Sequence, residues 1–287
     1  MSAHPREADP LPQEAHQPKT RVPKGATDCH FHIFGPADRY PLSQHRMYDP
    51  ADASVERYRR MAATLGIERV VIVQPSAYGS DNRCTVDAIT AFGKDRARGI
   101  AVVEPDVSVK DLEHLYQAGI RGLRINLITG RTPIDALPVL AARVAGIGMH
   151  MQLWLKGERL SEIAAVLPNI DVPVVLDHMG QVPAALGTDH PQFRTLLSLL
   201  ETGKVWVKLT GYRISSGPPY ADLARPVEKI LAMAADRCVW GSDWPHPFLE
   251  GKAMPNDGDL LDLLASWCDA ELLKRILVDN PARLYGF

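Results

Sequence analysis

Short apolar runs alternate with amphipathic stretches along the chain from about residue 25 onward. Eight runs rich in Val, Ile and Leu have the length of strands and span 26–33, 69–74, 99–104, 121–127, 149–155, 172–178, 204–210 and 237–243. Segments with the apolar spacing of helices span 53–65, 109–118, 133–145, 157–167, 191–202, 220–234 and 270–279. The pattern therefore predicts an α/β fold in which strands and helices alternate.

The repeat number favours one architecture over another. Eight strand and helix repeats in a segment of about 250 residues are typical of a single (β/α)8 TIM-type barrel. Glycines suited to helix C-termini follow several of the predicted helices, namely Gly66, Gly119, Gly146 and Gly203. A doubly wound open sheet is the alternative, but no Gly-x-Gly-x-x-Gly motif opens the first helix.

The first 24 residues differ in composition from the rest. They are rich in Pro, His, Glu and Lys and contain few large aliphatic side chains. Such a segment buries too little apolar surface to offset the entropy of ordering. We therefore expect residues 1–24 to form a disordered extension without chemistry, and residues 25–287 to form one barrel domain.

Charge and cysteine usage exclude several classes of protein. The 287 residues carry a formal net charge of -2, with acidic and basic residues interspersed, so we expect no nucleic-acid or membrane partner and a small-molecule ligand instead. The four cysteines are scattered without a Cys-x-x-Cys pair, which favours free thiols in a reducing compartment. No apolar segment approaches a membrane span or a signal-peptide core, and we expect a cytoplasmic protein.

Candidate reactive side chains lie where predicted strands end. His30 and His32 are two residues apart on the first strand and should share one face, with Cys29 and Phe31 on the other. His178 ends the sixth strand and Asp243 ends the eighth. Because function in a barrel gathers at the carboxyl ends of the strands, we expect these groups to meet, whereas His150 begins its strand and should face the other end.

The chemistry of this set suits hydrolysis of an ester. Asp243 can take a proton from a water molecule that attacks a carbonyl carbon. The imidazoles of His30, His32 and His178 can polarise the carbonyl and stabilise the oxyanion that forms. The same side chains could instead hold zinc, because histidines, a carboxylate and a water meet the ligand requirement of a catalytic site.

The ordered motifs resemble the amidohydrolase superfamily, and within it the branch of 2-pyrone-4,6-dicarboxylate lactonase and related sugar-lactone hydrolases. The resemblance extends from Gly25 to Tyr285 and rests on residues 28–36, Tyr48, 73–76, 98–103, 122–126, 176–180, 240–247 and 280–285. It implies a barrel enzyme, a lactonase that opens a carboxylated lactone with water activated by Asp243. It also implies metal-free hydrolysis, since this branch acts without a metal.

The strand ends support the expectation of no metal and no other cofactor. The metal-dependent members of the superfamily place a histidine at the end of strand five and often Lys or Glu at strand four. In this chain, strand five ends with Lys156 and strand four offers Arg124. A cation at either place would repel Zn²⁺.

Two arginines indicate an acidic substrate. Arg124 and Arg213 follow strand runs at the expected rim, and the planar guanidinium matches a carboxylate. The resemblance adds Tyr48 and Ser76 as ligand contacts.

Three positions depart from the lactonase pattern. Gln181 stands where that pattern has Arg, Trp154 where it has Tyr, and Arg131 aligns only loosely with its second arginine after strand four. Losing a bidentate arginine in a closed pocket costs on the order of 2 kcal/mol. We therefore expect a lactone with one carboxylate, of the muconolactone or aldaric-acid type, in place of the pyrone dicarboxylate.

Other functions remain compatible with the same residues. The rim could move an acyl group between hydroxyls as a lactone isomerase, or act as a metal-dependent decarboxylase or hydrolase, although a decarboxylase would need the missing strand-five histidine. The chain could also be a catalytically silent ligand-binding barrel. Asp243 disfavours the last hypothesis, because an unused buried carboxylate is costly.

Overall fold

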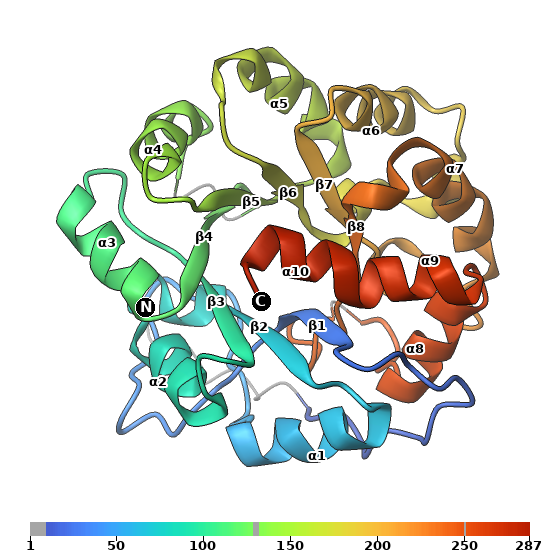
Figure 1. Ribbon diagram of the computed structural model, residues 1–287, viewed down its shortest axis with the longest axis horizontal. Coiled ribbons are helices and arrows are strands. Elements are labelled where there is room, and N and C mark those ends of the chain that lie inside the picture. Colours follow the sequence, from blue (N-terminus) through green and yellow to red (C-terminus); the bar gives the residue numbers. More distant parts are fainter. Residues whose placement is uncertain (1–9, 129–131, 250) are drawn as a thin grey trace, which may run out of the picture.

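The structure is a computed structural model that describes residues 10–128, 132–249 and 251–287. Eight parallel strands pair in sequence order and form a barrel with helices around it (Figure 1). The strands are β1 Thr27–Phe31, β2 Arg69–Val73, β3 Ala97–Ala101, β4 Ile120–Asn126, β5 His150–Trp154, β6 Val174–Leu176, β7 Val205–Lys208 and β8 Cys238–Val239. The prediction of a single (β/α)8 barrel is confirmed.

The helices occupy the gaps between strands and follow the last one. They are α1 Val55–Leu65, α2 Arg83–Phe92, α3 Val109–Gln117, α4 Ala136–Ala145, α5 Leu160–Val166, α6 Pro191–Glu201, α7 Ala224–Ala234, α8 Asp257–Ala265, α9 Ala270–Lys274 and α10 Asn280–Tyr285. The sequence pattern missed α2 and α8, because α2 contains β-branched residues and α8 has a glycine in its first turn, both weak helix formers. Within the described residues, no helix has both the length and the apolarity needed to cross a bilayer.

Backbone hydrogen bonds close the barrel between its first and last strands. Strand β8 is short, and the chain beyond it continues alongside β1. The amide of Cys29 donates to the carbonyl of Trp240 at 2.9 Å, and the amide of Asp243 donates to the carbonyl of His30 at 2.7 Å. This closure holds Asp243 directly beside His30.

One layer of side chains inside the barrel is apolar. It contains Cys29, Val71, Val73, Ile100, Val175, Trp206, Val239 and Tyr285. Tyr285 belongs to α10, which lies across one end of the barrel in Figure 1. The ring of His150 packs 5.3 Å from that of Tyr285, so His150 faces this closed end, as expected. The open end of the barrel is therefore the opposite one, at the carboxyl ends of the strands.

A bulge in β1 corrects one detail of the predicted alternation. The pairing of β1 with β2 shifts register between Asp28 and Phe31. Cys29 joins the interior layer, while the Phe31 ring stacks outward on Tyr58 with centroids 3.6 Å apart. The strict placement of Cys29 and Phe31 on one face was wrong, because a bulge adds a residue to one strand and breaks the period of two.

Part of the predicted disordered extension has fixed contacts in the structure. The amide of His16 donates to Asn256 at 2.8 Å, and the amides of Lys19 and Thr20 donate to the carboxylate of Asp262 at 3.0 and 2.9 Å. Polar backbone groups thus find partners on and beside α8 without an apolar core of their own. Residues 1–9 of the extension lie outside the described residues.

Candidate active site

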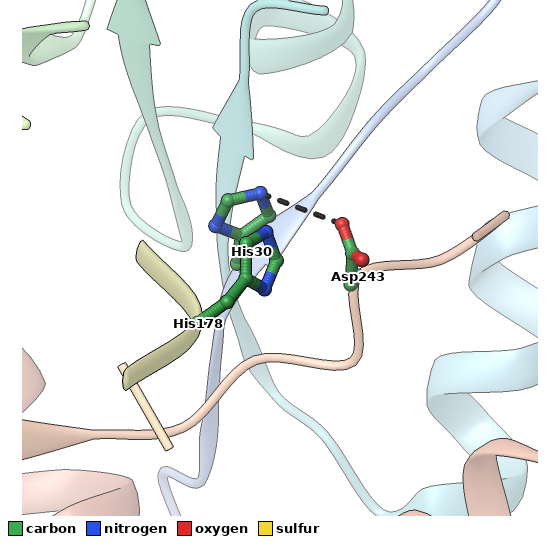
Figure 2. Close-up of side chains that lie close together, drawn as sticks. All are labelled: His30, His178 and Asp243. Carbon is green, nitrogen blue, oxygen red and sulfur yellow. Dashed lines mark ion pairs between the residues drawn. The ribbon is translucent and has the colours of Figure 1, made fainter. Parts of the chain in front are cut away.

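The four predicted reactive side chains meet at the open end of the barrel. His30 lies on β1, His32 follows β1, His178 follows β6, and Asp243 follows β8. The Nε2 atoms of His30 and His32 lie 3.5 and 3.4 Å from Oδ1 of Asp243. Figure 2 shows His178 beside His30, and their ring centroids are 4.9 Å apart. All four side chains are buried, so the cluster lies at the base of the mouth rather than on the surface.

Left-handed backbone places two of these residues. Strand β6 ends at Leu176, earlier than predicted, and His178 has φ 49° and ψ 48°. Asp243 also has a positive φ of 66°. Non-glycine residues with this backbone cost of order 1–2 kcal/mol each, and such strain concentrates at functional sites. The turn after β6 therefore carries His178 across the top of the barrel instead of continuing the strand.

Asp243 has one oxygen held by protein donors and one directed at the histidines. Its Oδ2 accepts hydrogen bonds from Nε of Arg213 and from the Tyr212 hydroxyl, the latter at 2.6 Å. Its Oδ1 has no hydrogen-bond partner within the described chain and faces His30 and His32. Burial raises the pKa of Asp243, but the charge of Arg213 outweighs burial and holds the pKa well below its usual range. Asp243 is therefore ionised, and Oδ1 is the oxygen that no protein donor holds within the described residues.

The histidines around Asp243 are neutral. Burial, followed by Lys208, lowers the pKa of His30 well below its usual range. Burial also lowers the pKa of His32, and that of His178 to about 4. Each neutral imidazole can donate one hydrogen bond and accept one, so these rings offer both donors and acceptors beside the carboxylate.

A second charged network lies beside this cluster and was not predicted. Asp177 accepts from Nε of Arg124 at 3.0 Å and from Nε2 of Gln152 at 3.1 Å. Lys208 lies 3.5 Å from the other oxygen of Asp177 and donates to Oε1 of Gln152 at 2.8 Å. Burial would raise the pKa of Asp177, but the positive charges of Lys208 and Arg124 beside it hold the pKa well below its usual range. The network supports His30, whose Nδ1 lies 3.1 Å from Nζ of Lys208.

Asp28, which precedes the two histidines, ties β1 to the loop after β8. Its carboxylate accepts from the amides of His30 and Ser242, both at 3.0 Å, and from the Tyr58 hydroxyl at 2.9 Å. Burial raises the pKa of Asp28 to about 6. Its position in the Asp-x-His-x-His motif was visible in the sequence, but its role as an internal acceptor was not.

The two predicted substrate arginines each contact an internal carboxylate. Arg213 binds Asp243, and its terminal nitrogens donate to the carbonyls of Pro247 and Phe248 at 2.8 and 3.2 Å. The sequence predicted that Arg213 would bind a substrate carboxylate, whereas its guanidinium donates to Asp243 and to the loop after β8. Arg124 binds Asp177 and lies over the Trp154 ring, 4.9 Å from its centroid.

Two clefts open beside the cluster and share Met47. One is lined by Ser76, Arg124, Asn126 and Glu104 among others, and the second by Trp154, Lys156, Gln181, Arg213 and Lys252 among others. Tyr48 is buried nearby, its ring stacked on Phe248 with centroids 5.8 Å apart. Arg131 lies outside the described residues. Lys156, which was not predicted to touch a ligand, adds an exposed cation to the second cleft.

The cluster contains donors that fit a metal ion. Ligand atoms of His30, His178 and Asp243 lie within 4.8 Å of one another. Three buried atoms, Nε2 of His30, Nδ1 of His178 and Oδ1 of Asp243, have no hydrogen-bond partner in the described part of the chain. A divalent cation held there would polarise a carbonyl oxygen. Two cations already touch these ligands, Arg213 at Asp243 and Lys208 at His30.

Comparison with known proteins agrees with this geometry. The amidohydrolase family matches residues 27–287. A 4-sulfomuconolactone hydrolase of Hydrogenophaga intermedia is 38% identical over 273 residues, which cover 92% of this chain and 90% of that protein. A 2-pyrone-4,6-dicarboxylate hydrolase of Comamonas testosteroni is 36% identical, with 94% and 92% covered, and a D-galactarolactone isomerase of Agrobacterium fabrum is 33% identical, with 93% of both chains covered. The chain belongs to the amidohydrolase family, as its motifs predicted.

Proposed function

We propose that the protein is a hydrolase that opens the ring of a carboxylated lactone. The observation that carries this proposal is the ionised, buried Asp243, whose Oδ1 lies between two neutral histidines at the mouth of the barrel. The names of the relatives support it, since two of the three are hydrolases of acidic lactones.

The residues divide the reaction between them. Asp243 takes a proton from water as the water oxygen bonds to the lactone carbonyl carbon, and those histidines that present an N–H to the carbonyl oxygen stabilise the oxyanion. The tetrahedral intermediate then collapses, the bond from the carbonyl carbon to the ring oxygen breaks, and the protonated Asp243 returns its proton to the leaving oxygen. The product is an open-chain hydroxy acid, or the enol of a keto acid where the ring oxygen was bonded to an alkene carbon, and the enzyme regains its starting protonation state.

Positive charge at the mouth supports an acidic substrate. Arg124 lines the first cleft, and Lys156 and Lys252 line the second. Trp154 and Gln181, which carry no charge and line the second cleft, would contact the ring. Ser76 in the first cleft and Tyr48, which stacks on Phe248 of the second cleft, complete the proposed binding residues, and Arg131 is proposed from the sequence alone. The protein would need no cofactor, and its free thiols suit the cytoplasm.

Hydrolysis of a panel of carboxylated lactones tests the proposal directly. The panel should contain muconolactone-type and aldaric-acid lactones, a sulfonated analogue and the pyrone dicarboxylate. Release of one acid equivalent per turnover supports a hydrolase. An isomerase, the second candidate favoured by the galactarolactone relative, would convert one lactone to another without acid release. No turnover of any member would refute both.

We expect Arg124 to bind the carboxylate of the substrate. Substituting Arg124→Lys keeps the positive charge but loses the planar group, so KM for a carboxylated lactone should rise by roughly tenfold. The methyl ester should be a poor substrate of the native enzyme and lose little more in the variant. The control is Arg121→Lys on the same strand, where the arginine donates to backbone carbonyls near α3. Equal hydrolysis of acid and ester by the native enzyme would contradict an acidic substrate.

Turnover is expected to survive removal of metal ions. Arg213 and Lys208 supply positive charge at Asp243 and His30, and a divalent cation would have to enter beside both. The enzyme should retain activity after prolonged dialysis against a chelator, and elemental analysis should find well below one equivalent of zinc. Stoichiometric zinc whose removal abolishes turnover and whose return restores it would show a metal-dependent reaction.

The acid limb of the pH profile should lie well below the ordinary histidine pKa. Burial lowers the pKa of His178 to about 4, and the pKa of Asp243 lies well below its usual range. Both groups keep their reactive form above these values and lose it as the pH falls through them. Values of kcat/KM should therefore stay level from about pH 8 down to about pH 5. A half-maximal value near pH 6.5 would mean that a histidine with ordinary pKa controls the reaction.

A further inference from the structure

Lys208 is a charged side chain sealed inside the barrel. It ends β7 and has no exposed surface. Its Nζ lies 2.8 Å from Oε1 of Gln152, 3.1 Å from Nδ1 of His30 and 3.5 Å from Oδ1 of Asp177. An ammonium group has three protons and no lone pair, so each of these atoms must act as an acceptor toward it.

The orientation of Gln152 supports this assignment. Its amide nitrogen donates to Oδ2 of Asp177 at 3.1 Å, which turns its oxygen toward Lys208. Asp177 also lies 3.2 Å from Nδ1 of His30, but its Oδ1 has no hydrogen-bond partner in the described part of the chain. Nδ1 of His30 thus faces both Nζ of Lys208 at 3.1 Å and Oδ1 of Asp177 at 3.2 Å, and of the two contacts the one with Lys208 has the geometry of a hydrogen bond.

We propose that Lys208 is a positioning residue that fixes His30 in the tautomer protonated at Nε2. A neutral imidazole carries one proton, so a ring that accepts at Nδ1 must donate at Nε2. That nitrogen points toward Oδ1 of Asp243, 3.5 Å away, and into the reactive cluster. Burial, with Lys208 as the next contribution, keeps the pKa of His30 low and the ring neutral.

His32 has the opposite tautomer. Its Nδ1 lies 2.8 Å from the carbonyl oxygen of Val73, which can only accept, so Nδ1 carries the proton and Nε2 carries the lone pair. The two rings are 5.1 Å apart and present one donor and one acceptor beside Asp243. On the proposed function, His32 and Asp243 accept the protons of the attacking water, while His30 donates to the carbonyl oxygen.

Nitrogen-15 NMR of histidine-labelled enzyme tests the tautomers without any substrate. The His30 signals, identified by their loss in His30→Gln, should show a protonated Nε2 and an unprotonated Nδ1, and those of His32 the reverse. In Lys208→Met the His30 pattern should change toward protonation at Nδ1, while the His32 pattern stays. The control Lys204→Met removes a half-buried lysine next to the same strand, one that donates to a backbone carbonyl away from His30, and should change neither.

Kinetics supply the second measurement. Losing an aligned donor to the oxyanion should lower kcat by about 10²-fold in Lys208→Met and change KM by less than about threefold. A native His30 protonated at Nδ1, or at both nitrogens, would overturn the proposal even if the variant fails to fold. A correct tautomer in an enzyme that hydrolyses no lactone would leave the role of Lys208 intact and refute the proposed function instead.

Discussion

Asp243→Asn is expected to lower kcat by at least about 10³-fold while the protein stays folded. An asparagine oxygen can still accept a hydrogen bond from Tyr212, but the amide cannot take a proton from water. Substrate affinity should change little, because the loss falls on the transition state. Steady-state kinetics and calorimetric titration with the lactone measure the two quantities separately.

The interpretation of this variant depends on its fold. The substitution leaves the buried Arg213 without its carboxylate, so circular dichroism and thermal unfolding must accompany the kinetics. Asp243→Glu keeps the charge and provides a second variant, which should be impaired but more active than Asp243→Asn. Asp236→Asn, at the opposite end of the barrel just before β8, is the matched control and should have native activity. A near-native rate in folded Asp243→Asn would remove Asp243 from the mechanism.

The convergence of the reactive residues could be predicted because it depends on topology. Parallel strands of a barrel end on the same side, so residues that follow β1, β6 and β8 must gather there whatever lies between them. His30, His32, His178 and Asp243 meet for this reason. The left-handed turn at His178 could not be predicted, because left-handed backbone is uncommon for any residue other than glycine, and His178 and Met179 adopt it alongside Gly180.

The partners of charged residues were harder to predict than their positions. The sequence placed Arg124 and Arg213 correctly near the mouth, but a guanidinium there can bind a substrate or an internal carboxylate. The structure gives both an internal partner, Asp177 and Asp243 respectively. Lys208 and Gln152 were also visible as polar residues in apolar strands. Only the structure shows that Nζ of Lys208 on β7 donates a hydrogen bond to Oε1 of Gln152 on β5, across the intervening strand β6.

The charged network at Asp177 explains why the interior of the barrel can contain cations beside the reactive histidines. Buried charges are tolerated when they are paired and hydrogen-bonded. Asp177 contacts Lys208, Arg124 and Gln152, and all four side chains are buried. The carboxylate thus neutralises positive charge close to His30, and the same arrangement fixes the side chain that contacts the reactive ring.

Removal of this carboxylate should destabilise the fold strongly. Asp177→Asn preserves the shape of the side chain but leaves Lys208 and Arg124 as uncompensated buried cations. Breaking a buried ion pair in this way costs about 3–5 kcal/mol, so the free energy of unfolding in urea at pH 7 should fall by that amount. Asp171→Asn is the matched control, because Asp171 is 90% exposed and lies 3.8 Å from Lys204, where the loss should stay below about 1 kcal/mol.

The stability difference between the native protein and Asp177→Asn should depend on pH, and this dependence distinguishes an effect of charge from an effect of shape. Because the pKa of Asp177 is lower in the folded protein than its ordinary value of 3.8, its stabilising effect is present above that value and disappears as the pH falls through the folded pKa. The free energy of unfolding of the native protein should therefore approach that of Asp177→Asn below about pH 4. Protonation of Asp243 lowers the stability of both proteins alike, so it does not contribute to the difference between them. A difference that stays constant from neutral to acidic pH would show that Asp177 stabilises the barrel by packing and hydrogen bonding alone. A loss no larger than that of Asp171→Asn would show that the buried network contributes no net stability.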